Sequence, residues 1–331
     1  MSIQIAIIGL GQIGTSIGLA LTSKDDLIRR VGYDRDINVA RQAERMGALD
    51  RVVNNLPTAV RDSDLAVLSV PMDQIRETLA VIAMNLKNNG IVMDTGPVKE
   101  PVTAWASELL PSNRHYIGLT PVLNPAYLHA TDSGVTAARS DLFRGGVMAI
   151  VAPPRASSEA VKMAADLTRI LGAVPLFVDP IEIDSLMATT HILPQLMAAA
   201  LLNATIDQPG WREGRKIAGR AYAEATGPIV HLDDAHTLRV SVLQNRENML
   251  RVLDGTIAAL QAIRADIDIE DAEALEKRLD RARTGRERWW RQRQAAEWTG
   301  TETMNAAELP KSSDVFGRLL GFGGRKTKPK K

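Results

Sequence analysis

The sequence contains no cysteine in 331 residues. This absence excludes disulfide-stapled scaffolds, zinc sites built on thiolates, iron–sulfur clusters and cysteine nucleophiles. It fits a chain that works in a reducing cytoplasm, which is the compartment we expect. The sequence also lacks an uninterrupted apolar run of the roughly 20 residues that a bilayer requires, so no membrane span is predicted.

The sequence has almost no excess of either charge. It contains 40 Lys and Arg side chains and 39 Asp and Glu side chains, so its net charge is +1. A chain this balanced has no overall field that favours nucleic acid or a membrane, so we predict neither as a partner. Residues 309–331 depart from this balance, with seven basic side chains and one acidic one. We predict that residues 299–331 form a basic, disordered tail.

The length and the composition, with 45% hydrophobic and 24% charged side chains, are typical of two globular domains. In the first half, short apolar runs rich in β-branched residues alternate with helical patterns, which predicts an α/β fold with a doubly wound parallel sheet over residues 1–179. The predicted strands are 3–8, 31–33, 65–70, 91–93, 116–118, 147–151 and 174–178. The predicted helices between them are 13–22, 38–46, 73–86, 100–110 and 157–171.

After Pro180 the strand pattern stops. Apolar side chains at helical spacing and a high alanine content predict an all-helical C-terminal domain over residues 180–298. The predicted helices are 181–204, 213–225, 232–253, 258–264 and 270–294, and the last of these is laced with charged pairs.

A glycine-rich turn follows the first predicted strand and opens the first predicted helix. Gly9, Gly11 and Gly14, with Gln12 and Ile13 between them, spell G-x-G-x-x-G. In a Rossmann fold the first glycine allows a tight turn, the second lets the backbone approach a pyrophosphate, and the third lets the helix pack on the strand. This position predicts dinucleotide binding, and the alternative is a turn that binds no ligand.

Asp34 ends the second predicted strand, where an acidic residue takes the ribose 2′-hydroxyl of a dinucleotide. A carboxylate there repels the 2′-phosphate of NADP, so NAD is the expected cofactor, although Arg35 beside it weakens this preference. Ser69, Val70 and Pro71 follow at the carboxyl end of a later strand. They either contact the cofactor or simply end the strand with a proline.

With the glycine turn, four further segments make the chain resemble the prephenate/arogenate dehydrogenase family. They are Gly32-Tyr33-Asp34, Met46-Gly47-Ala48-Leu49-Asp50, Asp64-Leu65-Ala66-Val67-Leu68-Ser69-Val70-Pro71 and Asp94-Thr95-Gly96-Pro97-Val98-Lys99. The resemblance covers residues 3–255 and implies a Rossmann domain followed by a helical domain that forms a homodimer. It also implies oxidation of a ring hydroxyl with NAD(P) and loss of a carboxylate as carbon dioxide, on the route to tyrosine.

The chain departs from that family at four substrate positions. Pro97 stands where the family has a serine that touches substrate, and Thr120 where it has the histidine that accepts the hydroxyl hydrogen bond. His191 keeps the first histidine of a helical motif, but Gln195 replaces the second, and Gly227 replaces an arginine that anchors a carboxylate. Because hydroxyl and glycine cannot supply an imidazole's proton acceptor or a guanidinium clamp, we expect weak or no turnover of prephenate and arogenate.

His191, Lys99 and Thr120 remain as candidate catalytic residues. His191 would assist proton removal near the interdomain cleft, although a lone histidine on an apolar helix face also fits a core residue. Lys99 either polarises a substrate oxygen or caps the start of a helix. Thr120, with Asn124 and Tyr127, lies in a stretch after the sheet that would border a remodelled pocket. No metal site is predicted.

Two classes of function remain after these observations. The first is an NAD-dependent oxidoreductase that transfers a hydride from a small hydroxy acid. The alternative is a catalytically inactive regulator or scaffold that binds a dinucleotide. A third class, the β-hydroxyacid dehydrogenases, shares the fold plan but fits the 94–99 segment less well. A proton acceptor within about 3 Å of a substrate oxygen would distinguish an enzyme from a sensor.

Overall fold

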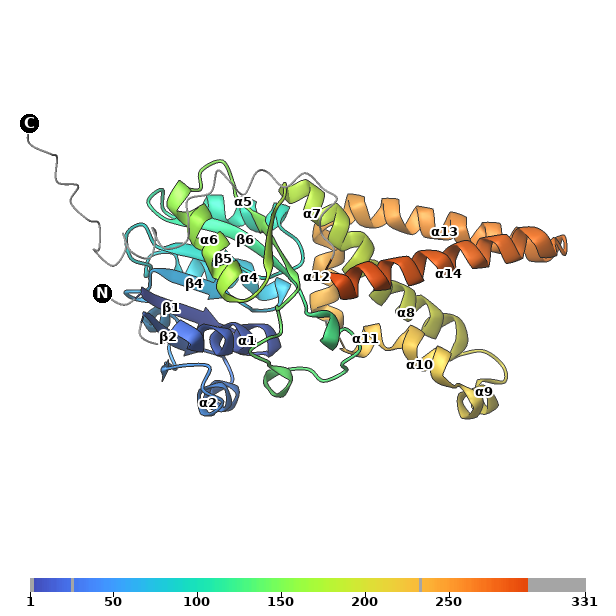
Figure 1. The fold of residues 1–331 in the computed structure, drawn as a ribbon, viewed down its shortest axis with the longest axis horizontal. Coiled ribbons are helices and arrows are strands. Elements are labelled where there is room, and N and C mark those ends of the chain that lie inside the picture. Colours follow the sequence, from blue (N-terminus) through green and yellow to red (C-terminus); the bar gives the residue numbers. More distant parts are fainter. Residues whose placement is uncertain (1–2, 25–26, 232–233, 297–331) are drawn as a thin grey trace, which may run out of the picture.

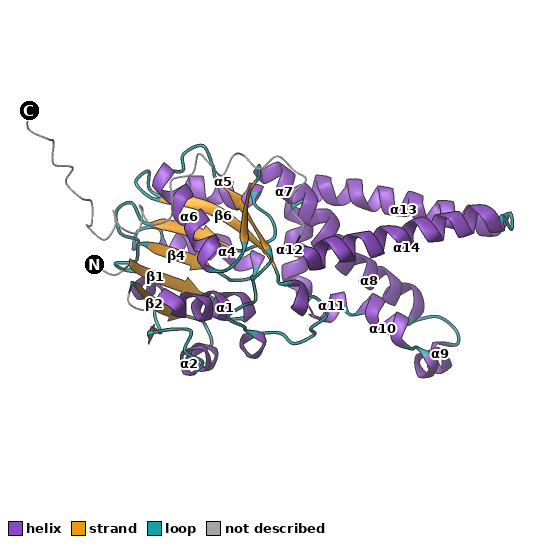
Figure 2. Cartoon of the chain, in the orientation of Figure 1, coloured by secondary structure: helices purple, strands orange, loops and turns teal. Residues whose placement is uncertain are grey.

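The computed structural model describes residues 3–24, 27–231 and 234–296. Among them an α/β part is followed by an all-helical part, as the orange strands and purple helices of Figure 2 show. This arrangement confirms the predicted fold class. The predicted tail, 299–331, lies outside the described residues.

Eight strands form one sheet in the order β3-β2-β1-β4-β5-β6-β7-β8 (Figure 1). The strands are β1 Ile3–Ile8, β2 Ile28–Tyr33, β3 Arg51–Val52, β4 Leu65–Leu68, β5 Ile91–Asp94, β6 His115–Val122, β7 Val147–Val151 and β8 Val174–Phe177. The chain order reverses at β1, which pairs in parallel with β2 on one side and β4 on the other. In an open α/β sheet, ligands bind beside such a reversal, outside the carboxyl ends of the strands.

The sheet is mostly parallel, as predicted, and contains one antiparallel pairing. Strands β3, β2, β1, β4, β5 and β6 are parallel to one another, but β7 pairs antiparallel with β6, and β8 runs parallel to β7. A parallel return would require a crossover of a dozen or more residues that is usually helical. The connection between β6 and β7 instead contains two three-residue 3₁₀ turns, η2 Pro125–Tyr127 and η3 Val135–Ala137.

Helices cover both faces of the sheet. They are α1 Gln12–Leu21, α2 Ile37–Arg45, α3 Leu56–Val60, α4 Met72–Ile82, α5 Glu100–Leu109 and α6 Ser158–Ile170, with the short η1 Thr22–Lys24. Buried side chains of α1, α2 and α6 share one apolar core with the sheet, and those of α3, α4 and α5 share the other. The sheet is therefore doubly wound. The sequence analysis missed β3 and α3, which are too short to show a periodic pattern.

The helical part begins directly after the sheet. Its elements are α7 Pro180–Met187, a π-helical turn η4 Ala188–Ile192, α8 Leu193–Thr205, α9 Trp211–Ile217, α10 Arg220–Thr226, α11 Pro228–His231, α12 Ala235–Gln244, α13 Arg246–Asp268 and α14 Ala272–Ala295. The proposed domain boundary at 179–180 falls in the connection between β8 and α7. Helices α13 and α14 pack together as a long hairpin that points away from the sheet (Figure 1).

Three predicted helices are interrupted, each at a residue that disfavours a regular turn. In the predicted helix 181–204, Pro194 has no backbone N–H for the carbonyl four residues before it, and the chain widens into the π turn just upstream. Gly219 separates α9 from α10, and Asn245 separates α12 from α13. By length and composition alone, the run Pro180–Thr205 is apolar and long enough to cross a membrane; in the fold its C-terminal half packs on α10, α11 and α13.

The helical part docks on the sheet face that carries α4 and α5. Ala188, Ile192 and Leu238 are buried in the same apolar core as Leu68 and Met72. Helix α12 packs against α4 and helix α7 against α5, the helices that leave the carboxyl ends of β4 and β5. The fold therefore brings the helical domain to the edge of the sheet where a ligand is expected.

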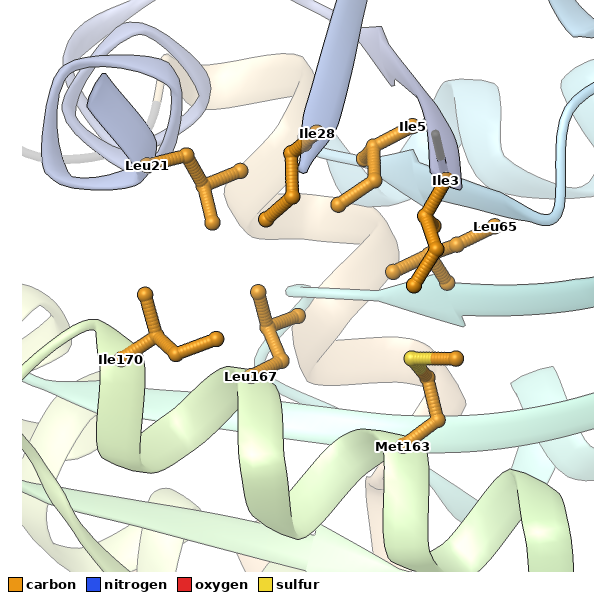
Figure 3. Close-up of a pocket in the computed structure, with 8 residues that line it drawn as sticks. All are labelled: Ile3, Ile5, Leu21, Ile28, Leu65, Met163, Leu167 and Ile170. Atoms are coloured by element: carbon orange, nitrogen blue, oxygen red, sulfur yellow. The ribbon is translucent and has the colours of Figure 1, made fainter. Parts of the chain in front are cut away.

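The opposite sheet face contains a small apolar cavity of about 10 Å³ (Figure 3). It is lined by Ile3, Ile5, Leu21, Ile28, Leu65, Met163, Leu167 and Ile170. A space of this size holds about one water molecule, and its walls offer no polar partner to one. The cavity is therefore a packing defect under α6 and no candidate for a ligand site.

Candidate functional site

The glycine turn is fixed by close contacts at its first and last glycines. Gly9 has φ +86°, and a Cβ added there would lie 2.4 Å from the Ser69 carbonyl oxygen. A Cβ on Gly14 would lie 1.9 Å from the Gly9 carbonyl oxygen. The surrounding protein therefore requires glycine at both positions. This agrees with the predicted roles of Gly9 in a tight turn and of Gly14 in helix–strand packing.

Gly11 differs, because nothing in the described protein requires its missing side chain. An added Cβ meets no atom within 4 Å, and its φ of −69° suits any residue. Helix α1 starts at the next residue with no side-chain cap and no acidic residue in its first turn. The open space and the uncapped N–H groups fit a pyrophosphate.

Two neighbours of Gly11 have defined places. Gln12 Nε2 donates to the Ala137 carbonyl oxygen at 3.3 Å, which ties the start of α1 to η3. Ile13 is partly buried against the apolar core. The turn therefore offers backbone N–H groups to a ligand.

Asp34 lies directly beside the turn. Its carboxylate accepts the Leu10 N–H at 2.7 Å and the Asp36 N–H at 2.9 Å. Each carboxylate oxygen has a second lone pair, so the same group can still accept hydrogen bonds from a ribose. Arg35 is exposed next to it.

The residues after β4 form a wall of the turn. Strand β4 ends at Leu68, the Ser69 N–H donates to the Ile8 carbonyl oxygen at 2.7 Å, and the Ser69 backbone contacts Gly9. Val70 is half-buried and Pro71 precedes the first turn of α4. Ser69 and Val70 therefore lie beside the glycine turn, directly after the end of the strand.

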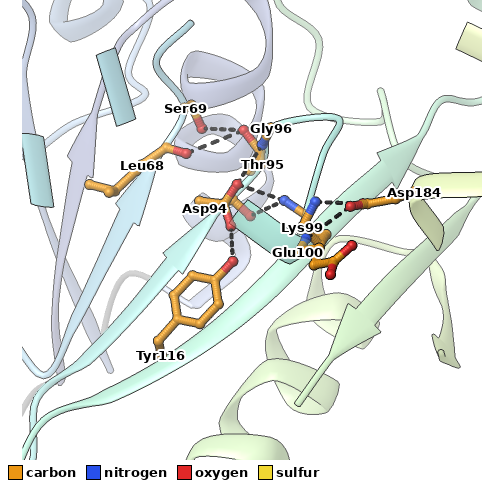
Figure 4. A network of polar contacts seen from close by, with 9 residues as sticks. All are labelled: Leu68, Ser69, Asp94, Thr95, Gly96, Lys99, Glu100, Tyr116 and Asp184. Carbon is orange, nitrogen blue, oxygen red and sulfur yellow. Dashed lines mark hydrogen bonds and ion pairs between the residues drawn. The ribbon is translucent and has the colours of Figure 1, made fainter. Parts of the chain in front are cut away.

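A buried polar network lies at the ends of β5 and β6 (Figure 4). Lys99 Nζ lies 2.6 Å from Asp94 Oδ2, and both side chains are fully buried. Tyr116 donates its hydroxyl to Asp94 Oδ1 at 2.6 Å. Burial lowers the pKa of Lys99, against the opposing effect of Asp94, while burial and the Asp94 charge raise the pKa of Tyr116 well above its usual value.

Asp184 joins this network from the helical domain. Its carboxylate accepts the Lys99 N–H at 2.5 Å and the Glu100 N–H at 2.9 Å, and it is 1% exposed. Burial raises the pKa of Asp184 to about 6, although the N–H groups of Glu100 and Lys99 and the Lys99 charge favour its ionised form. Asn245 Nδ2 donates to the Asp184 carbonyl oxygen at 2.7 Å.

The three candidate catalytic residues do not converge on one point that the described contacts define. Lys99 directly precedes α5, where its side chain makes no capping hydrogen bond, and its ammonium binds Asp94. Thr120 is 2% exposed on β6, on the same strand face as Tyr116, and its hydroxyl has no hydrogen-bond partner among the described residues. His191 is half-buried in η4, where its carbonyl oxygen accepts Gln195 Nε2 at 3.2 Å.

Asp184 and Tyr116 were not among the predicted site residues. Asp184 contacts a backbone amide 85 residues away, and no local pattern reports such a contact. The available signal is an acidic residue inside an otherwise apolar helix, because buried acids require partners. In the described ranges, no group of three or more His, Asp or Glu side chains is arranged to hold a metal ion.

The raised pKa of Asp184 predicts a pH-dependent stability. Between pH 3.8, its unshifted pKa, and about 6 the folded chain holds a proton that the unfolded chain has lost, so stability falls as pH rises through this window. The contribution is at most about 3 kcal/mol. The free energy of unfolding, measured with urea at several pH values, should fall for wild type relative to Asp184→Asn over this range. For Asp254→Asn, a change at an exposed residue, it should vary with pH in the same way as for wild type. Parallel curves for all three chains would contradict the prediction.

Comparisons with known proteins agree with this geometry. Residues 17–176 match the family model of the prephenate dehydrogenase nucleotide-binding domain. The prephenate dehydrogenase of Bacillus subtilis is 24% identical over 83% of this chain and 73% of its own. The cyclohexadienyl dehydrogenase of Zymomonas mobilis is 26% identical over 82% of this chain and 91% of its own.

Solved structures show the same fold. The prephenate dehydrogenase of Aquifex aeolicus, in complex with hydroxyphenyl propionate and NAD⁺, superposes with a TM-score of 0.77 at 20% identity, over 87% of this chain and 98% of its own. The arogenate dehydrogenase of Synechocystis gives a TM-score of 0.69 at 19% identity, over 87% of this chain and all of its own. By these comparisons, residues 17–176 match the nucleotide-binding domain of prephenate dehydrogenases, and the chain as a whole is similar in sequence and fold to the prephenate/arogenate dehydrogenase family.

Proposed function

We propose that this protein is an NAD-dependent oxidoreductase that takes a hydride from a small hydroxy acid. The observation that carries the proposal is the open space at Gly11 above the uncapped N-terminus of α1, with the Asp34 carboxylate beside it. The NAD⁺ named with the Aquifex aeolicus structure supports the same cofactor. When bound, the nicotinamide would supply the hydride acceptor.

The protein's own groups would bind and orient that cofactor. Gly9, Gly11, Gln12, Ile13 and Gly14 would hold the pyrophosphate with backbone N–H groups. Asp34 would accept hydroxyls of the adenosine ribose. We infer a preference for NAD over NADP, because a 2′-phosphate would meet a carboxylate already fixed by two backbone N–H groups, with the exposed Arg35 as the available counter-charge.

The substrate side is where this chain differs from its family. Four positions differ from the family pattern. Thr120 and Gln195 stand in place of two histidines, Pro97 in place of a serine and Gly227 in place of an arginine. His191 remains the imidazole that would accept a proton, and the buried Thr120 hydroxyl is a second polar group available to a ligand. We propose that the acid oxidised is not prephenate or arogenate.

A catalytically inactive dinucleotide-binding regulator is the second candidate. The observation in its favour is that the same four replacements remove proton acceptors and a carboxylate-binding cation while the glycine turn and Asp34 are kept. A sensor would bind dinucleotide at this turn and would need nothing on the substrate side.

We also propose that the protein forms a homodimer through its helical domain. Large apolar side chains are exposed on these helices, where a partner would bury them. They include Ile181, Leu186, Ile206, Ile217, Leu243, Leu250, Ile257, Leu260 and Ile267. The cytoplasm remains the compartment we expect.

The glycine turn provides the sharpest test of cofactor binding. Gly11→Ala should leave the free energy of unfolding within about 1 kcal/mol of wild type, since the new Cβ meets no protein atom. The same variant should bind NADH at least about tenfold more weakly, because the Cβ occupies the pyrophosphate space. Gly14→Ala is the contrasting variant, and it should unfold more easily by about 1–3 kcal/mol because of the overlap with Gly9. Calorimetric titration and urea unfolding measure these effects, and unchanged NADH affinity in Gly11→Ala would refute the proposed site.

Turnover separates the enzyme from the regulator. NADH formation should appear with at least one member of a panel of small hydroxy acids and should fall in His191→Gln. With prephenate or arogenate as substrate, the rate of NADH formation should be about 10² to 10⁴ times lower than the rate expected with a histidine in place of Thr120. NADH binding without turnover of any acid would favour the regulator, and rapid turnover of prephenate would show that the four replacements do not matter.

The dimer is tested by the mass of the protein in solution. Light scattering should give twice the chain mass for wild type. Leu260→Asp on α13 should shift the protein toward a monomer, because it places a charge in the proposed apolar contact. Leu176→Asp, at a similarly exposed site on the edge strand β8, is the matched control and should leave the dimer intact. A monomeric wild type, or dissociation by the control alone, would contradict this interface.

A further inference from the structure

The first turn of α5 is held by a carboxylate from the other domain. A helix N-terminus leaves backbone N–H groups that need acceptors, and α5 has no side-chain cap of its own. Asp184 of α7 supplies the acceptor for both the Lys99 and Glu100 N–H groups. The contact is buried, so water cannot replace it without an opening of the domain interface.

The same residue, Lys99, also ties α5 back to the sheet. Its ammonium binds Asp94, which simultaneously accepts the Tyr116 hydroxyl and, through Oδ2, the Gly96 N–H at 2.8 Å. Strand β6 is shaped around the lysine stem, since a Cβ on Gly118 would lie 2.8 Å from Lys99 Cδ. Two carboxylates and one ammonium thus share a site without solvent, where removal of either charge of a pair is costly.

Between Asp94 and Lys99 runs the loop 95–98, at the carboxyl ends of β4 and β5. The Thr95 N–H donates to the Leu68 carbonyl oxygen at 2.9 Å, and its hydroxyl lies 3.4 Å from Ser69 Oγ. The loop therefore borders the residues that wall the glycine turn. In a doubly wound sheet this edge faces the ligand, beyond the phosphate-binding turn.

A second polar contact joins the domains at the neighbouring helix. Thr237 of α12 donates its hydroxyl to Asp73 Oδ1 in the first turn of α4 at 3.0 Å. Helices α4 and α5, which follow β4 and β5, are thus both held at their first turns by the helical domain. Polar contacts at two places thus join that domain to the sheet edge.

We propose that Asp184, Lys99, Asp94 and Tyr116 form an interdomain latch that positions the loop 95–98 beside the nicotinamide half of the cofactor cleft. Lys99 is a positioning residue in this latch, and it does not touch the substrate. The latch itself follows from the contacts in this chain; its effect on a nicotinamide rests on the function proposed above.

The test compares variants that keep side-chain shape. Asp184→Asn removes the charge and one acceptor, and Tyr116→Phe removes the hydroxyl that holds Asp94. Asp166→Asn, another buried carboxylate, on α6, and Tyr222→Phe, whose hydroxyl bonds Thr205 within the helical domain, are the matched controls. Hydrogen exchange of the α5 first-turn amides reports the latch directly, and the affinities for ADP-ribose and NADH report which half of the cofactor site has changed.

In Asp184→Asn, the Lys99 and Glu100 amides should exchange about tenfold faster, as expected for loss of a charge-assisted hydrogen bond. NADH should bind about tenfold more weakly while ADP-ribose, which lacks the nicotinamide, stays within about twofold of wild type. Tyr116→Phe should also speed the exchange of these amides and weaken NADH binding, in each case by less than Asp184→Asn. If Asp184→Asn does not fold, the result for Tyr116→Phe decides whether the latch exists. The two controls should match wild type in both.

The results that overturn the proposal are distinct from those that overturn the cofactor. Wild-type exchange of the α5 amides in both latch variants would refute the latch. Equal weakening of ADP-ribose and NADH would refute the positioning of the loop 95–98. If the wild-type chain binds neither ligand, the proposed function and the role beside the nicotinamide both fail, and the exchange experiment alone then decides whether the latch exists.

Discussion

Helix N-termini that meet at one edge of a parallel sheet leave backbone N–H groups without acceptors, and this constraint shapes the whole molecule. Three helices, α1, α4 and α5, begin after β1, β4 and β5 at that edge. In α5 the helical domain supplies the Asp184 carboxylate as the acceptor for two of these N–H groups. At α4 its Thr237 hydroxyl instead donates to the Asp73 carboxylate in the first turn. In α1 no side chain caps the helix, so its donors are available to a ligand. The start of α5 therefore serves domain docking, and the start of α1 is the one proposed for the cofactor.

Much of the fold was predictable because its signals are local. Each predicted strand of the sheet is present, since a buried parallel strand reads as a short β-branched run. The antiparallel return of β7 could have been inferred from the lack of a helical pattern between 118 and 147, because parallel strands need a crossover. The two-residue β3 and the five-residue α3 could not, because each is too short for its period to repeat even twice.

The residues of the candidate site also differ in how far local sequence could predict them. Gly9, Gly11, Gly14 and Asp34 were predictable because a turn and the next strand determine their chemistry within a few residues. Lys99 was ambiguous, since an anion-binding lysine and a buried one look alike in sequence, and only its distance to Asp94 separates them. Asp184 depends on a contact between domains, which follows from how the helices pack and not from the residues around it.

The residues at the substrate positions are separate from those that join the domains or form the glycine turn. A substrate could therefore change while the fold stays the same. Backbone N–H groups at the start of α1 are available to the proposed pyrophosphate, and the domains are joined by carboxylates at the start of α4 and α5. None of these groups belongs to Thr120, Gln195 or Gly227. The proposed change of substrate therefore requires no change in the glycine turn or in the contacts that join the two domains.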